Sequence, residues 1–291
     1  MAVADAAVAA PTPAPAGASR LRFVVKLGGD VMDGPGTGSG SALLDLARAL
    51  AASGLRGRGL VVHGGGAQVT ALATRLGLPT HMVAGRRITD AATLEVMEMV
   101  VAGRLNVELC AALFGAGIAA VGLHAGSGVI RARRRPPRVM SGAGPDPIDF
   151  GLVGDVTGFD LALLETLVRA GHLPVLSCLG IDPSGQVLNL NADLAASQLA
   201  SALGAEALLA VTAVGGVRRR IDDPQSRIPR LTVAEARAAI ADGTVKGGMI
   251  PKLEEATAAI AAGVSRVEIV APHEIVAALA HPGTVGTQLV P

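Results

Sequence analysis

Two glycine-rich turns follow two strongly apolar segments near the start of the chain. One reads Lys26-Leu27-Gly28-Gly29, and the other reads His63-Gly64-Gly65-Gly66. A glycine turn that leads from a strand into a helix exposes backbone N–H groups, and such groups can hold an anion. Each turn alone is equally well explained as a tight connection. Two of them on adjacent strand–helix units favour one ligand site at the carboxyl ends of the strands.

These turns lack the standard nucleotide and hydrolase signatures. Neither contains the phosphate-binding pattern GxxxxGK[ST], and the glycine-rich segment 34–40 does not place its glycines in the GxGxxG register. The His-Gly-Gly-Gly segment could form an oxyanion loop, but the chain has no GxSxG elbow. The turns therefore indicate an anion site that belongs to none of these three classes.

Two lysines could supply positive charge to such a site. Lys26 ends an apolar strand just before a glycine pair, and Lys252 opens a helix after Lys246-Gly-Gly-Met-Ile-Pro. A cation is unfavourable in the first turn of a helix, so an anion that shares the site would explain Lys252. Both lysines could instead extend their ammonium groups into solvent. Charge clamps of this kind suit phosphoryl transfer, which needs positioning and neutralisation more than covalent chemistry.

The segment Leu188-Asn189-Leu190-Asn191-Ala192-Asp193 could supply the remaining polar groups. Alternation places Asn189 and Asn191 on one face of a strand, and Asp193 falls near the start of the next helix. An acid there could hold both lysines in place. Asn191 could equally be a plain N-cap and Asp193 a first-turn acid that the helix dipole favours. Capping does not account for Asn189.

Short apolar segments alternate with helical segments and would position these residues. Strands are predicted at 21–27, 59–64, 118–123, 173–178, 207–212 and 266–270, with a short final strand at the C-terminus. Helices are predicted at 42–53, 67–77, 90–113, 160–171, 192–203, 232–241 and 249–262. This alternation predicts an α/β fold, a three-layer α/β/α sandwich around a central, mainly parallel sheet. Residues 128–158 interrupt it and predict a protruding β-hairpin, in which the five arginines of 131–138 are interpreted as a solvated loop.

The composition narrows the class of function. The chain has 291 residues, of which 50% are hydrophobic and 17% charged, and this argues against global disorder. Aromatic residues make up 1% and the net charge is +1, so nucleic-acid binding is disfavoured. Two cysteines exclude a disulfide framework, and no apolar run is long enough to predict a membrane span. We expect residues 1–20, rich in Ala and Pro, to form a disordered tail, and the protein to be cytoplasmic.

Taken in order, several segments resemble the amino acid kinase family, and within it the acetylglutamate kinases. They are VVKLGGDVM, VVHGGGAQVT, GRRITDAATLEVMEMVVAGRLNVEL, LNLNADLAASQLASALGAE and GTVKGGMIPKLEEATAAIAAGV. They extend from about residue 22 to residue 287. The resemblance implies ATP-dependent phosphorylation of the side-chain carboxylate of N-acetyl-L-glutamate, with Mg²⁺ held mainly by the phosphates.

The resemblance also implies a role for individual residues. Lys26 and Lys252 would stabilise the transferring phosphoryl group, and Asp193 would orient both. Arg87 would bind the substrate's α-carboxylate through its planar guanidinium. The other implied positions are Asn189, Asn191, Gly64 and Gly65 for the substrate and Gly28, Gly29, Thr212 and Gly248 for the nucleotide, with the glycine N–H groups as donors. Residues 21–200 would form a lobe for the amino-acid substrate and dimer contacts, and residues 201–291 a nucleotide lobe.

The chain departs from the family pattern at informative positions. Ala213 stands where an Asp is usual, which affects the nucleotide contacts, and Arg86 stands where Leu is common. The tail does not resemble the amphipathic helix of hexameric members, so we expect a homodimer. Two alternatives stay open: a kinase for a related N-modified acid of the aminoadipate type, which Arg86 would permit, and a metabolite sensor on the same fold, for which Ala213 argues.

Overall fold

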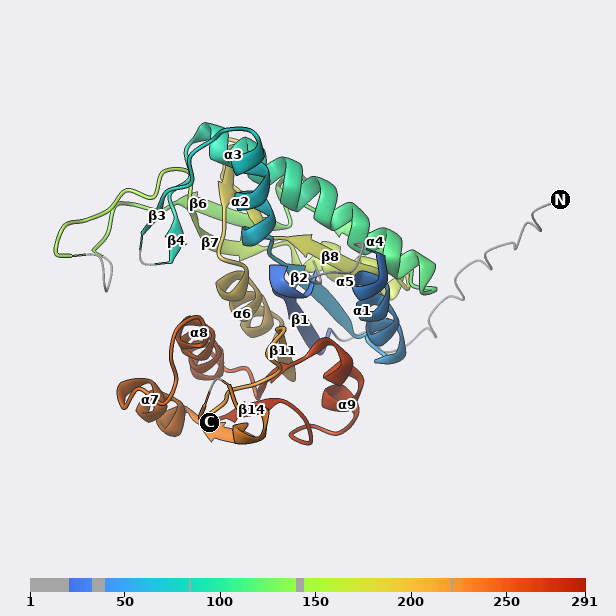
Figure 1. Ribbon diagram of the computed structural model, residues 1–291. Helices are drawn as coiled ribbons and strands as arrows, with labels where there is room; N and C mark the ends of the chain where they lie inside the picture. Colours follow the sequence, from blue (N-terminus) through green and yellow to red (C-terminus); the bar gives the residue numbers. More distant parts are fainter. Residues whose placement is uncertain (1–20, 33–39, 84, 140–143, 221) are drawn as a thin grey trace.

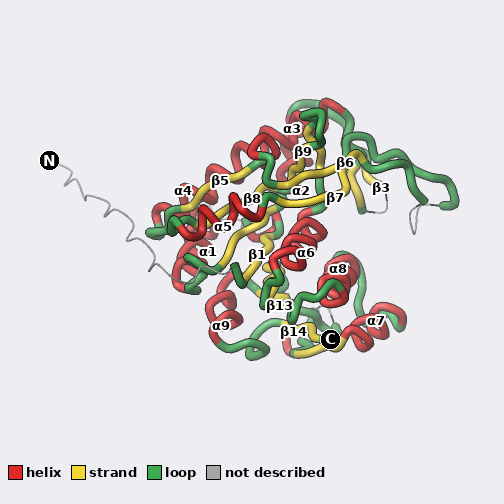
Figure 2. The backbone as a smooth tube through the Cα atoms, turned by 180° about the vertical axis from the view of Figure 1, so that it is seen from behind, coloured by secondary structure: helices red, strands yellow, loops and turns green. Residues whose placement is uncertain are grey.

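The computed structural model describes residues 21–32, 40–83, 85–139, 144–220 and 222–291. The tail predicted at 1–20 and most of the glycine-rich segment 34–40 lie outside these ranges. Within the described ranges no helix is long and apolar enough to cross a membrane. Figures 1 and 2 show the arrangement of the elements from opposite sides.

The central sheet contains eight strands in the order β12-β14-β13-β11-β1-β2-β8-β5. Every neighbouring pair is parallel except β13 with β14, which confirms the predicted, mainly parallel sheet. The strands are β1 (Phe23–Leu27), β2 (Gly59–His63), β5 (Ala120–Leu123), β8 (Leu173–Ser177), β11 (Ala207–Val211), β12 (Arg230–Thr232), β13 (Val267–Val270) and β14 (Thr287–Val290).

Helices cover both faces of this sheet, because its strands are apolar on both sides. Phe23, Val25 and Leu27 of β1 pack with α1, α2, α4 and α9, whereas Val24 packs with α5, α6, α7 and α8. The three-layer prediction is therefore confirmed. These helices are α1 (Gly40–Ala52), α2 (Gly66–Arg75), α4 (Asn106–Gly115), α5 (Leu161–Arg169), α6 (Ala192–Leu203), α7 (Val233–Ala241), α8 (Met249–Ala261) and α9 (Ile275–Ala280).

The helix predicted at 90–113 is present but irregular. It begins as α3 (Ala91–Met97), widens into the π-helix η2 (Glu98–Leu105) and continues as α4. Asp90 caps its start, since its side chain accepts a hydrogen bond from the Thr93 N–H at 2.8 Å. Apolar periodicity alone could not predict the π-helix. Short 3₁₀ turns elsewhere are η1 (Gly29–Val31), η3 (Ala125–Ser127), η4 (Pro224–Ser226) and η5 (Pro272–Glu274).

A second, smaller sheet has the order β10-β9-β6-β7. Its strands are β6 (Ile130–Arg134), β7 (Gly154–Phe159), β9 (Leu179–Ile181) and β10 (Val187–Asn189), and a separate ribbon pairs β3 (Met82–Val83) with β4 (Arg86–Arg87). The predicted hairpin is confirmed, because β6 and β7 pair antiparallel and the described residues that follow β6 and precede β7 project from the molecule (Figure 1).

The predicted division near residue 200 does not coincide with a break in the structure. This position falls inside α6 (Ala192–Leu203). The central sheet continues from β1 directly to β11, so strands from both proposed lobes form one hydrogen-bonded sheet. The assignment of the two parts to substrate and nucleotide stays a prediction.

Candidate functional site

The two glycine turns lie side by side at one edge of the central sheet. Strands β1 and β2 are parallel neighbours in which Leu27 pairs with His63. The turns that follow are directly linked, since the Gly64 N–H donates to the Leu27 carbonyl at 3.2 Å. The predicted shared position at the carboxyl ends of adjacent strands is confirmed.

The buried Lys26 and the partly exposed Asp193 form an ion pair beside these turns. The Lys26 ammonium lies 2.8 Å from the Asp193 carboxylate, and the lysine is 5% exposed. Alternation along β1 places Lys26 on the same face as Val24, which α6 covers, and Asp193 lies in the first turn of α6. A buried ammonium requires such a partner, so Lys26 is a fixed charge at the edge of the sheet.

A cleft with a volume of about 300 Å³ contains most of the predicted site residues. Its walls include Lys26, Gly29, Gly64, Gly65, Arg87, Asn189, Asn191 and Asp193, together with Arg86, Met97, Val101, Arg135, Arg138, Phe150, Val153, Cys178 and Glu255. The cleft lies between the central sheet and the smaller sheet, because residues of both line it. Burial raises the pKa of the Cys178 thiol to about 11, so this side chain is an inert wall.

Arg87 offers an unused donor to this cleft. One of its terminal nitrogens, Nη2, donates to the Gly66 carbonyl at 2.9 Å and to the Thr70 hydroxyl at 2.7 Å. The other, Nη1, is buried and has no hydrogen-bond partner among the described residues. Burial lowers the pKa of the guanidinium, which still stays charged at neutral pH. An unpartnered buried donor beside a cleft is suited to a ligand carboxylate.

The two asparagines do not share a strand face as expected. Strand β10 ends at Asn189, whose amide donates to the Thr89 hydroxyl at 2.9 Å. Asn191 is the N-cap of α6, and its side chain accepts from the Leu194 N–H at 2.9 Å. The strand-face prediction is therefore wrong for Asn191, and the alternative N-cap is confirmed. Both residues nevertheless line the cleft.

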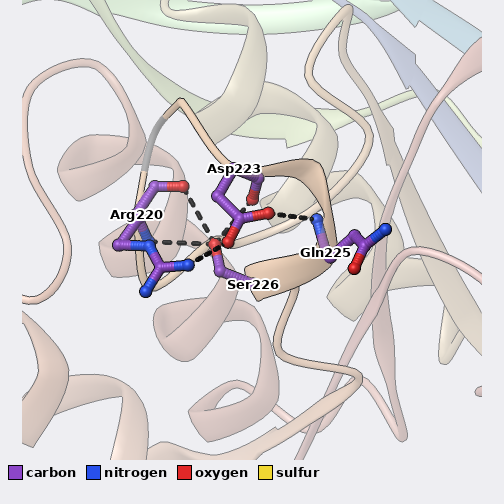
Figure 3. A network of polar contacts seen from close by, with 4 residues as sticks. All are labelled: Arg220, Asp223, Gln225 and Ser226. Atoms are coloured by element: carbon purple, nitrogen blue, oxygen red, sulfur yellow. Dashed lines mark hydrogen bonds and ion pairs between the residues drawn. The ribbon is translucent and has the colours of Figure 1, made fainter.

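A second cavity of about 620 Å³ lies next to α8. Lys252 and Gly248 line it, as do Lys246, Val214, Gly216, Val245, Met249 and the arginines Arg218, Arg219 and Arg220. Figure 3 shows how one wall is held: the Arg220 N–H donates to the Ser226 hydroxyl at 3.0 Å, and the Gln225 N–H donates to the Asp223 carboxylate at 2.8 Å. Apolar and cationic groups thus face one space.

Three predicted residues have positions that the sequence did not specify. Lys252 borders the second cavity, and the ion pairs between described residues do not include one between it and Asp193. Thr212 is buried, and its hydroxyl accepts from the Gly215 N–H at 3.2 Å. The Gly28 N–H donates to the Val211 carbonyl at 3.2 Å, so it is occupied by the sheet.

Asp30 joins the first glycine turn to the loop after β11. Its carboxylate accepts from the Ala213 N–H at 3.0 Å, across 183 residues of sequence. A Cβ atom at Gly28 would lie 2.0 Å from the Asp30 carboxylate, so a larger residue there would displace this carboxylate. The loop at Ala213, where the family's usual Asp is missing, is therefore anchored by an acid from another segment.

Arg135 and Glu255 were missed as site residues. The solvated-loop interpretation is wrong for Arg135, which is 6% exposed and forms an ion pair of 2.7 Å with Asp155. Burial and the nearby charge of Asp193 raise the pKa of Glu255. Arg135 lies within a run of arginines whose other members are not buried, so its sequence carried no distinguishing signal.

Comparisons with known proteins point to one family. The model of the amino acid kinase family matches residues 21–271. Acetylglutamate kinases of Sorangium cellulosum and Anaeromyxobacter dehalogenans are each 55% identical over 274 residues, which cover 92% of this chain and 94% and 98% of theirs. Among solved structures, an N-acetylglutamate synthase of Neisseria gonorrhoeae complexed with coenzyme A and N-acetyl-glutamate superimposes with a TM-score of 0.75 at 25% identity, covering 93% of this chain and 60% of that one. A Giardia carbamate kinase shares the fold, with a TM-score of 0.67 at 18% identity.

Proposed function

The chain belongs to the amino acid kinase family, and from this premise we infer that it transfers the γ-phosphoryl group of ATP to the side-chain carboxylate of N-acetyl-L-glutamate. The product is an acyl phosphate, and the reaction is a step of arginine biosynthesis. The match covers 94% and 98% of the two curated relatives, so their activity is inferred for this chain.

One observation carries the choice of acceptor. Five basic residues line the cleft, and two of them stand out: the buried Lys26 held by Asp193, and Arg87, whose buried Nη1 has no hydrogen-bond partner among the described residues. A dicarboxylate has one anionic group for each of them. We propose that Arg87 binds the α-carboxylate, so that the side-chain carboxylate reaches the glycine turns and Lys26. Asn189 and Asn191 would contact the N-acetyl-amino part.

The same residues account for transfer. An oxygen of the acceptor's side-chain carboxylate attacks the γ-phosphorus as the bond to the leaving ADP oxygen breaks, and no proton is transferred. Lys26, held by Asp193, and Lys252 would neutralise the charge that spreads over the phosphoryl oxygens. Lys26 lines the first cleft and Lys252 borders the second cavity. The phosphoryl group would therefore be transferred from a nucleotide in the second cavity to an acceptor in the first cleft.

The second cavity would hold the nucleotide. Its apolar residues suit a base, and its arginines and Lys246 suit the phosphates and ribose. Gly29, Gly28, Thr212 and Gly248 would border the phosphates. We propose that Mg²⁺ enters with ATP and is held mainly by the phosphates, where it would neutralise developing charge. Asp193 already pairs with Lys26, and the described residues contain no cluster of three metal-ligating side chains.

The two alternatives are less well supported. A sensor has no use for the Lys26–Asp193 ion pair beside an arginine with one unpartnered nitrogen, and Asp30 anchors the loop at Ala213. The aminoadipate-type kinase would need room for one more methylene. The identity to acetylglutamate kinases favours the shorter acceptor.

We further propose a cytoplasmic homodimer. Met99, Val107 and Phe114 lie on the long helix and are 50%, 64% and 59% exposed. Val107 and Phe114 are seven residues apart and share one side of α4. Strand β5 is the last strand of the central sheet next to this helix, and its outer edge has no pairing strand in the described chain. A second copy covering these groups would bury exposed apolar surface and an open sheet edge.

The activity is tested with MgATP and four acceptors: N-acetyl-L-glutamate, L-glutamate, N-acetyl-L-aminoadipate and carbamate. ADP release measures turnover, and hydroxylamine traps an acyl phosphate as a hydroxamate. We expect the wild type to turn over N-acetyl-L-glutamate selectively. The variant Lys252→Ala, assayed in parallel, should show strongly reduced turnover. Folded protein that binds nucleotide but turns over none of the acceptors would refute the proposed function and favour the sensor.

A further inference from the structure

His63 is a buried histidine at the end of β2, directly before the second glycine turn. It is fully buried, and alternation along the strand directs it toward α4 rather than toward Lys26 and α6. Its Nδ1 lies 3.0 Å from the Gly64 carbonyl oxygen, and its Nε2 lies 3.0 Å from the Asn106 amide nitrogen. Both ring nitrogens therefore have partners, one in the glycine turn and one in the helix.

The partners determine which ring nitrogen carries the proton. The Asn106 amide nitrogen also donates to the Val175 carbonyl at 3.1 Å, so its two hydrogens serve Val175 and His63. Nε2 of His63 is then an acceptor, and Nδ1 carries the hydrogen that it donates to the Gly64 carbonyl. Burial lowers the pKa of His63 to about 4, so the ring is neutral near pH 7.

The bond to the Gly64 carbonyl also fixes the N–H of the next residue. In a trans peptide the C=O and N–H point in opposite directions, and the described chain contains no cis bond. Holding the Gly64 carbonyl toward His63 therefore directs the Gly65 N–H away from it. The Gly64 N–H is already bonded to Leu27, so among the described residues the N–H groups of Gly65 and Gly66 are the donors that this turn can offer to a ligand, and His63 directs the first of them.

The π-helix supports the same turn from the other side. A Cβ atom at Gly65 would lie 2.5 Å from the Leu105 side chain and 3.3 Å from that of Val101, so only glycine fits. One turn of a π-helix spans about five residues. Val101 and Asn106 are five residues apart, and both face the turn or the histidine behind it. The irregular helix thus brings packing and hydrogen-bonding groups to one place.

We propose that His63 and Asn106 are positioning residues, which hold the Gly65 N–H toward the reacting carboxylate of the acceptor. The inference rests on the proposed function. The acceptor, not the nucleotide, is the affected ligand, because Arg87 donates to the carbonyl of Gly66, the next residue of the turn. Neither His63 nor Asn106 lines the cleft, so they act through the glycine turn.

Two substitutions separate the bond to Gly64 from the bond to Asn106. In His63→Asn the amide nitrogen takes the place of Nδ1 and still donates to the Gly64 carbonyl, although the smaller side chain leaves a cavity. In His63→Gln the amide reaches the place of Nε2 and preserves the contact with Asn106 while losing Gly64. A purely structural role predicts the larger defect in His63→Asn, because of its cavity.

We expect the opposite order in activity. His63→Gln should lower kcat/KM for N-acetyl-L-glutamate about three- to tenfold, the effect of one hydrogen bond, with the KM for ATP unchanged. His63→Asn should stay within about twofold in kcat/KM although it melts at a lower temperature. The control is the substitution His172→Asn. His172 is a half-buried histidine directly before β8, at the amino-terminal edge of the central sheet, and its replacement should change the KM of neither substrate.

Nitrogen-15 NMR of the wild type, with the His63 signals assigned by difference from His63→Asn, should show the Nδ1–H form of the ring. Equal kcat/KM for wild type and His63→Gln, or an Nε2–H ring in the wild type, would overturn the inference. A wild type without turnover on N-acetyl-L-glutamate would instead remove the proposed function, while the tautomer measurement would still decide the geometry.

Discussion

The substitution Arg87→Lys examines whether the acceptor's second carboxylate is recognised by a forked guanidinium. Nη2 of Arg87 is committed to the Gly66 carbonyl and the Thr70 hydroxyl, at 2.9 and 2.7 Å, and Nη1 is free to bind a ligand. Lysine keeps the positive charge but carries a single ammonium group. That group cannot keep both anchors and also present a donor in the plane of a carboxylate.

The expected magnitude follows from the bond that is lost. A hydrogen bond to a charged group contributes about 1.5 to 3 kcal/mol, which corresponds to a factor of about 10 to 150 in affinity. Because lysine retains the charge, we expect the KM for N-acetyl-L-glutamate to rise at the lower end of this range, about 10- to 50-fold. The KM for ATP should not change, since Arg87 does not line the nucleotide cavity.

The assay measures initial rates of ADP release with either substrate varied. Arg86→Lys is the matched control, because Arg86 precedes Arg87 in β4 and lines the same cleft. We expect the control to change the acceptor KM by less than about fivefold, because Arg86 is half-buried like Arg87 and lysine keeps its charge. An unchanged acceptor KM in Arg87→Lys, or a larger effect in Arg86→Lys, would show that the guanidinium does not bind the α-carboxylate.

Four further outcomes are expected. Lys252→Ala should lower kcat by about 10²- to 10³-fold with the fold intact by circular dichroism, and near-normal turnover would remove Lys252 from the mechanism. Asp193→Asn leaves the buried Lys26 unpaired and should lower the free energy of unfolding in urea by about 3 to 5 kcal/mol. The control Glu165→Gln breaks the exposed ion pair with Arg169 and should lower it by less than about 1 kcal/mol. Asp30→Ala should raise the KM for ATP several-fold and leave that for the acceptor unchanged, because Asp30 anchors the loop at Ala213; equal effects on both substrates would contradict this. The pKa of His63 is about 4 in the folded chain against 6.5 for a free histidine, so the unfolded chain binds this proton first as the pH falls. The free energy of unfolding should therefore decrease by about 3 kcal/mol between pH 6.5 and pH 4. His63→Asn should lack this component of the pH dependence.

The central sheet could be predicted because its strands are apolar and bounded by glycine. The pattern of Phe23–Leu27 and Gly59–His63 fixes two buried strands, and the parallel order follows from the helices between them. The positions of Lys26 and the glycine turns at one edge are consequences of that order. Strands such as β9 (Leu179–Ile181) and β4 (Arg86–Arg87) have two or three residues, which is too few for a period to be detected.

The remaining parts of the site depend on contacts between distant segments. Arg135 reads as one of five exposed arginines until Asp155, twenty residues later, pairs with it across the small sheet. The role of Asp30 depends on its hydrogen bond with the Ala213 N–H, which only the folded chain brings beside it. Asn191 satisfied both a strand pattern and a helix cap, and only the course of the backbone decides in favour of the cap. Such side chains are selected by tertiary neighbours, which local patterns do not encode.

The division of labour between the two sheets follows from these positions. The charged and glycine groups proposed for transfer lie at or beside the carboxyl edge of the central sheet, on β1, β2 and the starts of α6 and α8. The groups proposed for the acceptor come from the small sheet and the β3–β4 ribbon, among them Arg87 and Asn189. The bond from the Asn189 amide to the Thr89 hydroxyl links the end of β10 to the segment that follows β4. Substitutions in the small sheet can therefore alter the space for the acceptor without moving Lys26, whose position is fixed by a strand in the middle of the central sheet. Acceptor length should thus respond to changes at Phe150 and Val153, which line the cleft, while the KM for ATP stays constant.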